Sequence, residues 1–270
     1  MSRMYERITN YNKLAAFTLA EVLITLLIIG IVASIIIPSL ILDTKKNEIN
    51  LATKSAFSLI NEALRKTKIE NSNVPIMCYY HAVNPYGSAL CTGYNENGDC
   101  TGHTLLDGSP LPSDYNGYFY ECSKLLPEMK NHMGIGKTCT SGRALIDGCM
   151  PQYKGNDQIQ LDNNSSNTMY TQVDANRATS GCSGWRSASF TNKEAIVLNN
   201  GMIIIPYSTQ FANSPIIGID VNGMKPPNKA GHDLFFFYTK GLNGSSSYYP
   251  GGCQYSEPGG SSAYTILYAN

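Results

Sequence analysis

Apolar residues dominate the N-terminal part of the chain and are followed by a repeating pattern of apolar and polar positions. The 26 residues from Phe17 to Leu42 carry one charged side chain, that of Glu21. A helix of this length can cross a bilayer core of roughly 30 Å. Because an acidic side chain inside such a run is costly, we interpret Glu21 as a functional residue.

Beyond Leu42 the chain becomes polar but keeps the spacing of an amphipathic helix. Apolar residues recur at steps of three and four over residues 49–64, and charged residues fill the other faces. The pattern predicts one helix from about Phe17 to near Glu70, where Asn, Ser and Pro residues follow. Its outer part should lay an apolar stripe on a globular domain, with Phe57 as the largest contributor.

Short apolar runs in the last third of the chain predict an antiparallel sheet that packs on this helix. Ala195–Leu198 and Met202–Tyr207 are joined by Asn199-Asn200-Gly201, which is a hairpin signal. Helix and strand signals are weak over residues 75–185, so we expect irregular structure there. Three further runs are strand candidates: Ile216–Val221, Leu234–Thr239 and Tyr264–Tyr268.

Composition is typical of an exported globular protein. The net charge is zero, so no nucleic-acid surface is indicated. An even number of cysteines, all after the apolar run, favours up to four disulfides, whose connectivity the sequence does not determine. Cys91 with Cys100 and Cys139 with Cys149 are the simplest local pairs. The eight disulfide candidates are Cys78, Cys91, Cys100, Cys122, Cys139, Cys149, Cys182 and Cys253.

The leader that precedes the apolar run, residues 1–16, carries three basic residues and one acidic residue. A positive end of this kind is retained in the cytoplasm, so the rest of the chain would be exported. The apolar run is too long for the core of an ordinary secretory signal. The small residues Ala15 and Ala16 precede the apolar run, so a cleavage next to them would occur on the cytoplasmic side.

Residues 13–43 resemble the N-terminus of the type IV pilins and the type II secretion pseudopilins. The family pattern is a small residue, then Phe-Thr-Leu, any residue and Glu, followed by a long apolar helix. The resemblance implies that a prepilin peptidase cuts between Ala16 and Phe17 and methylates the new amine. Alanine at the cleavage site replaces the commoner glycine. The matching residues are Ala16, Phe17, Thr18, Leu19 and Glu21.

The resemblance also implies an assembly role for Glu21. Its carboxylate would pair with the Phe17 amine of a neighbouring subunit, so that a misplaced subunit would leave a charge unpaired in an apolar filament core. Glu21 would then set the register of assembly. The alternative is a carboxylate near the membrane interface that reaches into water.

Gly30 and Pro38 are the two helix-loosening positions in the apolar run. Proline inside a helix removes a hydrogen bond and clashes with the preceding turn, so Pro38 should kink the helix. The resemblance implies that the segment between them melts when subunits pack. An ordinary membrane-helix kink is the alternative.

A possible metal site follows from the segment that contains Asp220, Asn222 and Asp233. It is similar to a C-terminal segment of some pilin-like proteins, and some pseudopilins bind calcium in a comparable loop. Calcium takes six to eight oxygen ligands, which such residues could supply. The alternative, which we favour, is a tight turn at Asn222-Gly223 whose acidic residues cap loops. No cofactor is required on either interpretation.

Other candidate chemistry is weak. Cys78 with His81 and Cys100 with His103 have metal-like spacings, but neither belongs to a standard zinc set. Residues 134–138, Gly-Ile-Gly-Lys-Thr, look like the end of a phosphate-binding loop, but the first glycine of that motif is missing, so we expect an ordinary loop. We find no convergent catalytic set and predict that the protein is not an enzyme.

The predicted fold class is α+β, in which a long N-terminal helix packs on a C-terminal antiparallel sheet with disulfide-rich loops, as in pilins. The predicted regions are a leader (1–16), a transmembrane and filament-core helix (17–43), its amphipathic continuation (44–70) and an extracytoplasmic head (71–270). Within the head, 71–190 is rich in loops and cysteine and 191–270 forms the sheet.

These features predict a precursor in the bacterial inner membrane, with its N-terminus in the cytoplasm and its head outside. The mature form would assemble into a type IV pilus or a type II secretion pseudopilus. Implied partners are other copies, other pilin-like subunits, the prepilin peptidase and an inner-membrane assembly platform. The alternative is a signal-anchored binding domain or enzyme that does not polymerise. The sequence does not choose between pilus and pseudopilus, or between surface, cargo and DNA as a ligand.

Overall fold

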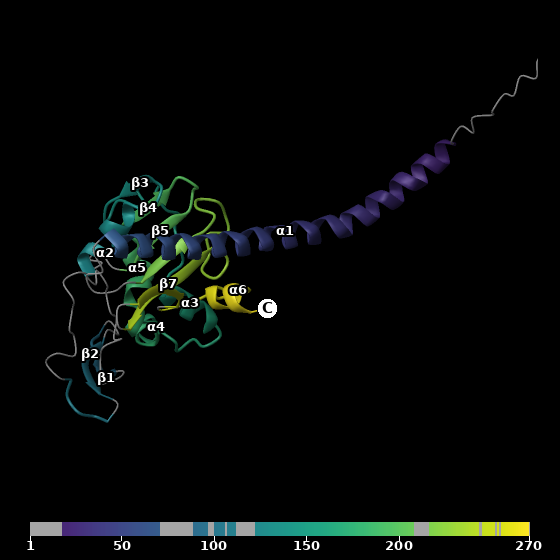
Figure 1. Cartoon of the computed structure of the whole chain (residues 1–270). Coiled ribbons are helices and arrows are strands. Elements are labelled where there is room, and N and C mark those ends of the chain that lie inside the picture. Colours follow the sequence, from purple (N-terminus) through teal and green to yellow (C-terminus); the bar gives the residue numbers. More distant parts are fainter. Residues whose placement is uncertain are drawn as a thin grey trace, which may run out of the picture. The chain divides into compact units, whose positions relative to one another are not determined.

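The computed structural model describes residues 18–70, 89–96, 100–105, 107–111, 122–207, 216–242, 245–251, 253 and 255–269. The chain divides into two compact units, Met1–Asn47 and Glu48–Asn270. Figure 1 labels the helices and strands. From here on, the head means the second unit, Glu48–Asn270, which also contains the outer part of the long helix, and each unit is described by itself.

A single helix, α1, occupies Leu19–Glu70 and confirms the predicted long helix. In the head its apolar stripe is buried at Ala56, Ile60, Ala63 and Leu64. The spacing of three and four residues places these side chains on one face. Phe57, which is partly buried, stacks on Phe237 with 6.0 Å between ring centroids.

The main sheet has six antiparallel strands in the order β3-β4-β5-β6-β7-β8. It confirms the predicted α+β class, with the helix packed on an antiparallel sheet. Each strand pairs with the next along the chain, in hairpin fashion. The strands are β3 (Ile135–Cys139), β4 (Ala195–Leu198), β5 (Ile203–Pro206), β6 (Ile217–Asp220), β7 (Leu234–Leu242) and β8 (Ser245–Pro250).

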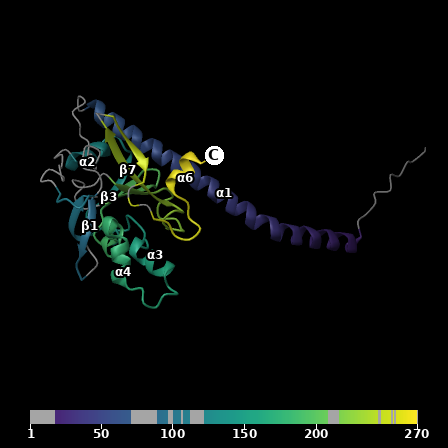
Figure 2. The ribbon, with the colours of Figure 1, turned by 90° about the horizontal axis from the view of Figure 1, so that it is seen from below.

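Both faces of the sheet are covered, which explains why its central strands are apolar without alternation. On one face Ile196, Ile204 and Phe235 pack with α1 and with α2 (Cys122–Lys130). On the other face Ile203 and Phe236 pack with a second cluster. A strand buried on both sides reads as a continuous apolar run. In Figure 2, α1 lies on one side of the strands and α3 (Asn156–Asn163) with α4 (Gln172–Ala178) lies on the other.

Hydrogen bonds join α1 to the edge strand β8. The Asn61 side chain accepts from the amide of Tyr248 at 2.7 Å and donates to the Tyr248 carbonyl at 3.5 Å. The Tyr248 ring is fully buried, and its hydroxyl lies 3.7 Å from the sulfur of Met129 in α2. The helix therefore covers this end of the sheet and provides hydrogen-bond partners for backbone groups of the edge strand.

Two expectations about elements were wrong, and one strand was missed. Tyr264–Tyr268 belongs to a helix, α6 (Ala263–Tyr268), because Ser262 caps its first turn and Ile266 and Leu267 pack on the core. Residues 134–138 are not a loop, since most of them form the edge strand β3. The strand β8 was not predicted, because its run of serines and tyrosines lacks an apolar pattern.

The region 75–185 is also more ordered than expected where the structure describes it. Besides α2, β3, α3 and α4 it contains a hairpin of β1 (Ala89–Tyr94) and β2 (Cys100–Leu105). A short helix, η1 (Ser180–Trp185), and α5 (Ser187–Phe190) follow α4. Trp185 and Phe190 from these two helices are fully buried in the second cluster, so the segment before β4 contributes large side chains to the core.

Candidate functional site

The predicted processing site adjoins the start of the described chain. Ala16 and Phe17 lie outside the described residues, and Thr18 is the first residue described. The structure therefore places three of the five residues singled out in this segment, namely Glu21, Gly30 and Pro38. All three lie on α1.

Glu21 lies in the first turn of α1 and caps its own helix. Its Oε2 atom accepts from the Thr18 amide at 2.8 Å and from the Thr18 hydroxyl at 2.8 Å, while the Thr18 hydroxyl accepts from the Glu21 amide at 3.2 Å. This reciprocal pattern is a capping box. Both donors use the same carboxylate oxygen. Among the described residues no hydrogen bond reaches Oε1.

The apolar part of α1 exposes its side chains all round. Leu19 is 80% exposed and Ile35 is 71% exposed. By length and composition the helix is apolar enough to cross a membrane. An exposed apolar surface of this extent marks contact with lipid or with another protein.

Hydroxyl groups in this part of α1 are satisfied within the helix. Thr25, Ser34 and Ser39 each donate to the backbone carbonyl three residues earlier, at 2.9, 2.7 and 2.8 Å respectively. Such bonds remove the need for an outside partner. This is what a helix in a bilayer requires, because lipid offers no hydrogen-bond partners.

The helix continues through both loosening positions. A Cβ atom built on Gly30 would meet nothing within 4 Å, so no close contact in this structure requires glycine there. Pro38 lies inside the helix and has no amide hydrogen for the carbonyl of Ser34. The predicted melting between Gly30 and Pro38 on assembly stays a prediction.

The possible calcium residues lie at the two ends of the loop between β6 and β7. Asp220 ends β6, and Asp233 immediately precedes β7; both side chains are fully buried. Asp220 Oδ1 accepts from the amides of Asn222 at 3.1 Å and Gly223 at 2.7 Å, and its Oδ2 accepts from the Tyr153 hydroxyl at 2.7 Å. This is the turn geometry favoured from the sequence.

Asp233 is held in the same way. It accepts from the amides of Asn228 and Lys229, each at 2.7 Å. Burial raises the pKa of Asp220 to about 7, and the charge of Asp233 adds to this effect. Burial also raises the pKa of Asp233, while its hydrogen bonds to the two amides oppose the shift. Within the part of the chain that the structure describes, no group of three His, Cys, Asp or Glu residues is arranged to hold a metal ion.

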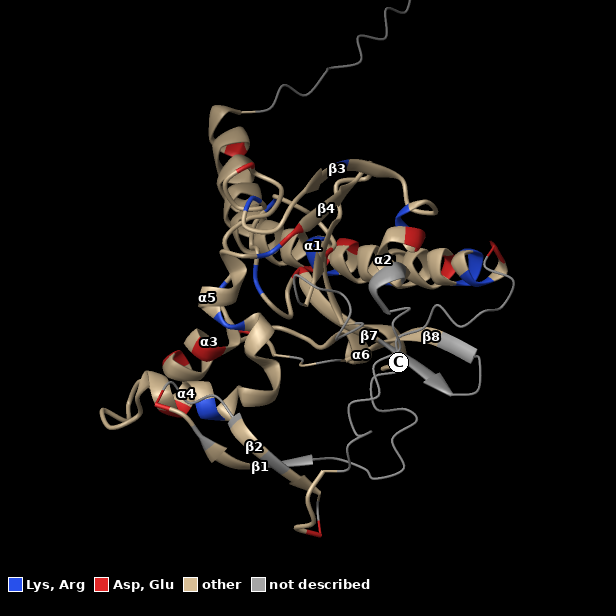
Figure 3. Ribbon diagram, turned by 90° about the vertical axis from the view of Figure 1, so that its left-hand side faces the viewer, with Lys and Arg blue, Asp and Glu red and all other residues tan. Residues whose placement is uncertain are grey.

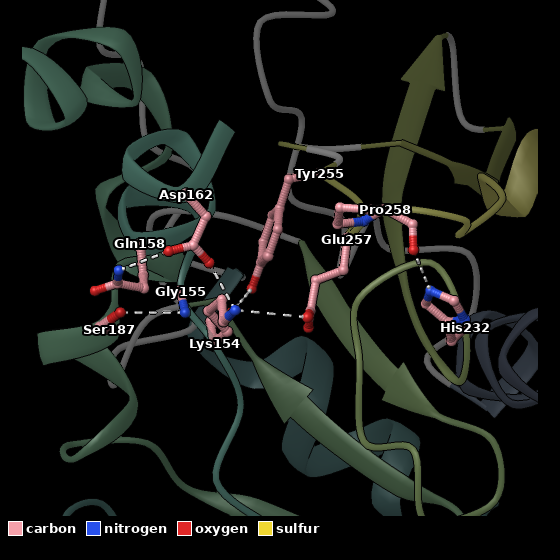
Figure 4. Close-up of polar contacts among 9 residues, drawn as sticks. All are labelled: Lys154, Gly155, Gln158, Asp162, Ser187, His232, Tyr255, Glu257 and Pro258. Atoms are coloured by element: carbon pink, nitrogen blue, oxygen red, sulfur yellow. Dashed lines mark hydrogen bonds and ion pairs between the residues drawn. The ribbon is translucent and has the colours of Figure 1, made fainter. Parts of the chain in front are cut away.

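A polar cluster between α3 and the C-terminal segment had no signal in the sequence (Figure 4). Lys154 pairs with Asp162 at 2.6 Å and lies 4.0 Å from the buried carboxylate of Glu257. The Tyr255 hydroxyl donates to the Lys154 carbonyl at 3.5 Å. His232 contacts the Pro258 carbonyl at 3.1 Å. These contacts attach the C-terminal segment to the rest of the head.

Lys193 is the second polar group that the sequence did not reveal. Its side chain is buried, donates to the Tyr207 carbonyl, and lies over the Trp185 ring with its Nζ atom 4.5 Å from the centroid. Burial lowers its pKa to about 7. Among the described residues no carboxylate pairs with it, and the aromatic faces stabilise the ammonium form instead.

Two disulfides are described in the head. Cys139 and Cys149 are bonded, which was one of the two local pairs considered above, and Cys182 is bonded to Cys253. The second bond joins η1 to the C-terminal segment. Cys91 and Cys100 lie on β1 and β2, but their side chains, like those of Cys78 and Cys122, fall outside what the structure describes.

Charged residues of both signs are interspersed on α1 within the head, as Figure 3 shows. Arg65 and Lys66 both pair with Glu62, at 2.7 and 3.5 Å. Such exposed pairs contribute little stability. This mixture matches the zero net charge of the chain.

No protein-family model, curated protein or solved structure matches this chain. The architecture itself, a long N-terminal helix with an exposed apolar half and an outer half packed on an antiparallel sheet, is compatible with a pilin-like protein.

Proposed function

We propose that this protein is a structural subunit that assembles through α1 into a filament of the type IV pilus or type II secretion class. The observation that carries the proposal is Glu21, the only charge among the 26 residues of the apolar run, on a helix whose apolar side chains are exposed among the described residues. The Ala16-Phe17-Thr18-Leu19 sequence before it is the second support.

Assembly would complete the hydrogen bonding of Glu21. The capping box uses Oε2 and leaves Oε1 for a donor from outside. After cleavage between Ala16 and Phe17, the new amine of a neighbouring subunit is a donor of the right charge. Pairing the two charges offsets the cost of holding each in an apolar filament core. The carboxylate would thereby select one register.

The proposed location, processing and assembly of the protein follow from this role. The precursor would lie in the bacterial inner membrane with residues 1–16 in the cytoplasm and the head outside. A prepilin peptidase would process it, and an assembly platform would add it to other copies or to other pilin-like subunits. We propose no catalytic activity, and the function would come from polymerisation.

The test compares two single variants of the full-length protein in cells. Glu21→Ala should reduce the protein recovered in sheared surface fractions at least tenfold while the membrane pool is maintained. Glu48→Ala is the matched control, because Glu48 is an exposed glutamate on the same helix outside the apolar run, and it should assemble normally. Normal filaments carrying Glu21→Ala would contradict the assembly role.

A signal-anchored domain that does not polymerise is the alternative. It would give no sheared fraction from the wild-type chain, and the two variants would behave alike in membranes. The same experiment therefore separates the two functions.

A further inference from the structure

The loop between β6 and β7, residues 221–233, is closed at both ends by buried carboxylates. Asp220 binds the amides of Asn222 and Gly223 at its start, and Asp233 binds those of Asn228 and Lys229 near its end. The amide of Val221 donates to the carbonyl of Asp233 at 3.0 Å, which joins the two ends. We call residues 220–233 the carboxylate loop.

The oxygens that could bind calcium in this loop already face hydrogen-bond donors. Calcium needs six to eight oxygens directed at one point. The carboxylates of Asp220 and Asp233 instead accept from four amides and from the Tyr153 hydroxyl. A cation bound by these oxygens would have to displace those donors, and the displaced Gly223 amide would then be buried without a partner.

Two backbone carbonyls inside the loop also have a hydrogen-bond partner, which is the side-chain amide of Asn228. With the Asn228 side-chain amide oriented to satisfy both of its ends, Nδ2 donates to the carbonyls of Lys225 at 2.9 Å and Gly223 at 3.2 Å. Asn228 has a positive φ of 53°, which asparagine tolerates better than most residues. Its NH₂ group thus lies between these two carbonyls, and a cation could bind both of them only by displacing that group.

Little ligand capacity remains. The Asn222 side chain donates to the Pro226 carbonyl at 3.3 Å, and its Oδ1 atom is the one buried side-chain oxygen of the carboxylate loop that lacks a donor among the described residues. A single free oxygen falls far short of a calcium shell. The residues therefore do not fit the calcium site that the resemblance to pseudopilins raised.

The closed loop also supports the neighbouring hairpin. Gly223 has a positive φ of 71°, and a Cβ atom there would lie 2.2 Å from the carbonyl of Gly201 in the β4–β5 turn. The loop can approach that turn only with glycine at this position. Opening the loop would consequently disturb β4 and β5 as well as its own residues.

We propose that the carboxylate loop is a hydrogen-bond lock that replaces calcium. Asp220 and Asp233 hold the backbone amides, and Asn228 holds the carbonyls. The head is then independent of calcium for its stability. This proposal concerns the head alone and does not depend on filament assembly.

The first test measures unfolding of the full-length protein in detergent micelles by the fluorescence of Trp185, the only tryptophan. The melting temperature in 1 mM EDTA and in about 10 mM CaCl₂ should agree within the error of the measurement. A ligand that binds only the folded state raises the melting temperature by mass action. An increase of several degrees with calcium, absent in Asp233→Asn, would overturn the proposal.

The second test replaces the side-chain NH₂ group of Asn228, a hydrogen-bond donor, with a carboxylate oxygen, which is an acceptor. Asn228→Asp places an oxygen where the NH₂ group faces two carbonyls, so the melting temperature should fall by several degrees and should partly recover in about 10 mM CaCl₂. Asn131→Asp, at an exposed turn, is the matched control and should show neither effect. An Asn228→Asp protein that melts like the wild type would show that this amide does not hold the loop, and would contradict the proposal.

Discussion

The carboxylates of Asp220 and Glu21 differ in how their hydrogen bonds are completed. Asp220 is fully buried in the head, and both of its oxygens accept from donors of the same chain. Glu21 lies on an exposed apolar helix and uses one oxygen for its own cap, leaving the other without a donor among the described residues. We interpret a carboxylate as structural when all of its hydrogen-bond donors belong to the same chain. A carboxylate that lacks a donor and lies on an exposed apolar helix is instead a candidate for binding another molecule.

The largest effect that separates these roles should come from Glu21→Gln. Glutamine can still serve in a capping box, so the helix cap is retained while the charge is lost. We expect at least a tenfold loss of protein from the sheared fraction, equal to that of Glu21→Ala, and no change in the melting temperature of the head. Assembly at wild-type levels would mean that Glu21 serves only as a helix cap.

Asp220→Ala should have the opposite profile. It leaves two amides and the Tyr153 hydroxyl buried without an acceptor, which should destabilise the head by about 3–5 kcal/mol. Chemical unfolding followed by Trp185 fluorescence measures this loss.

Asp107 provides the control, because it makes the same kind of turn at the surface. Its Oδ1 atom accepts from the amide of Ser109 at 2.9 Å and from the hydroxyl of Ser109 at 2.6 Å, but it is exposed. Asp107→Ala should cost less than about 1 kcal/mol, because water replaces the lost acceptor. Equal losses for the two variants would contradict the structural role of burial at Asp220.

The pH dependence of stability should sharpen the description of the head. The folded-state pKa of Asp220, about 7, lies above its ordinary value of 3.8, so the folded state binds the proton more tightly and stability falls as pH rises from about 4 to 7. The folded-state pKa of Lys193, about 7, lies below its ordinary value of 10.5. Stability should therefore rise again as pH increases from about 7 to 10.

These two slopes predict a minimum of stability near pH 7, with a depth on the order of a few kcal/mol. Unfolding midpoints at one-unit steps from pH 4 to pH 9 would measure it. Asp220→Asn should flatten the acid side, although Asp233 titrates in the same direction, and Lys193→Met should flatten the alkaline side. A maximum near neutral pH in the wild type would contradict both assignments.

The smallest effect is expected from Thr18→Val. It removes the hydroxyl from the capping box but leaves Glu21 charged, so the first turn of α1 loses about 1 kcal/mol. Filament yield should fall by no more than about threefold, and Thr18→Ser should restore the wild-type yield. A loss as large as that of Glu21→Gln would mean that the cap, rather than the charge, controls assembly.

The sequence was a good guide where periodicity determines structure. The long helix and the hairpin at Asn199-Asn200-Gly201 follow from spacing and turn chemistry, and both were predicted. Tyr264–Tyr268 was misjudged because tyrosine, threonine and isoleucine favour strands, whereas the Ser262 cap and the packing of Ile266 and Leu267 determine the outcome.

In the candidate sites, too, the sequence predicted local contacts but not those between distant segments. A turn at Asn222-Gly223 was predicted, because its donors are local. The Tyr153 hydroxyl that completes Asp220 lies 67 residues away, and the rings around Lys193 come from two other segments. Contacts of this kind depend on tertiary packing, which no local pattern encodes.

The measurement that tests the central claim most directly is the mass of the mature N-terminal peptide from membrane and sheared surface fractions. The account predicts that the sheared fraction contains chains that begin at Phe17 and carry one added methyl group. An intact leader that begins at Met1, confined to membranes, would contradict it.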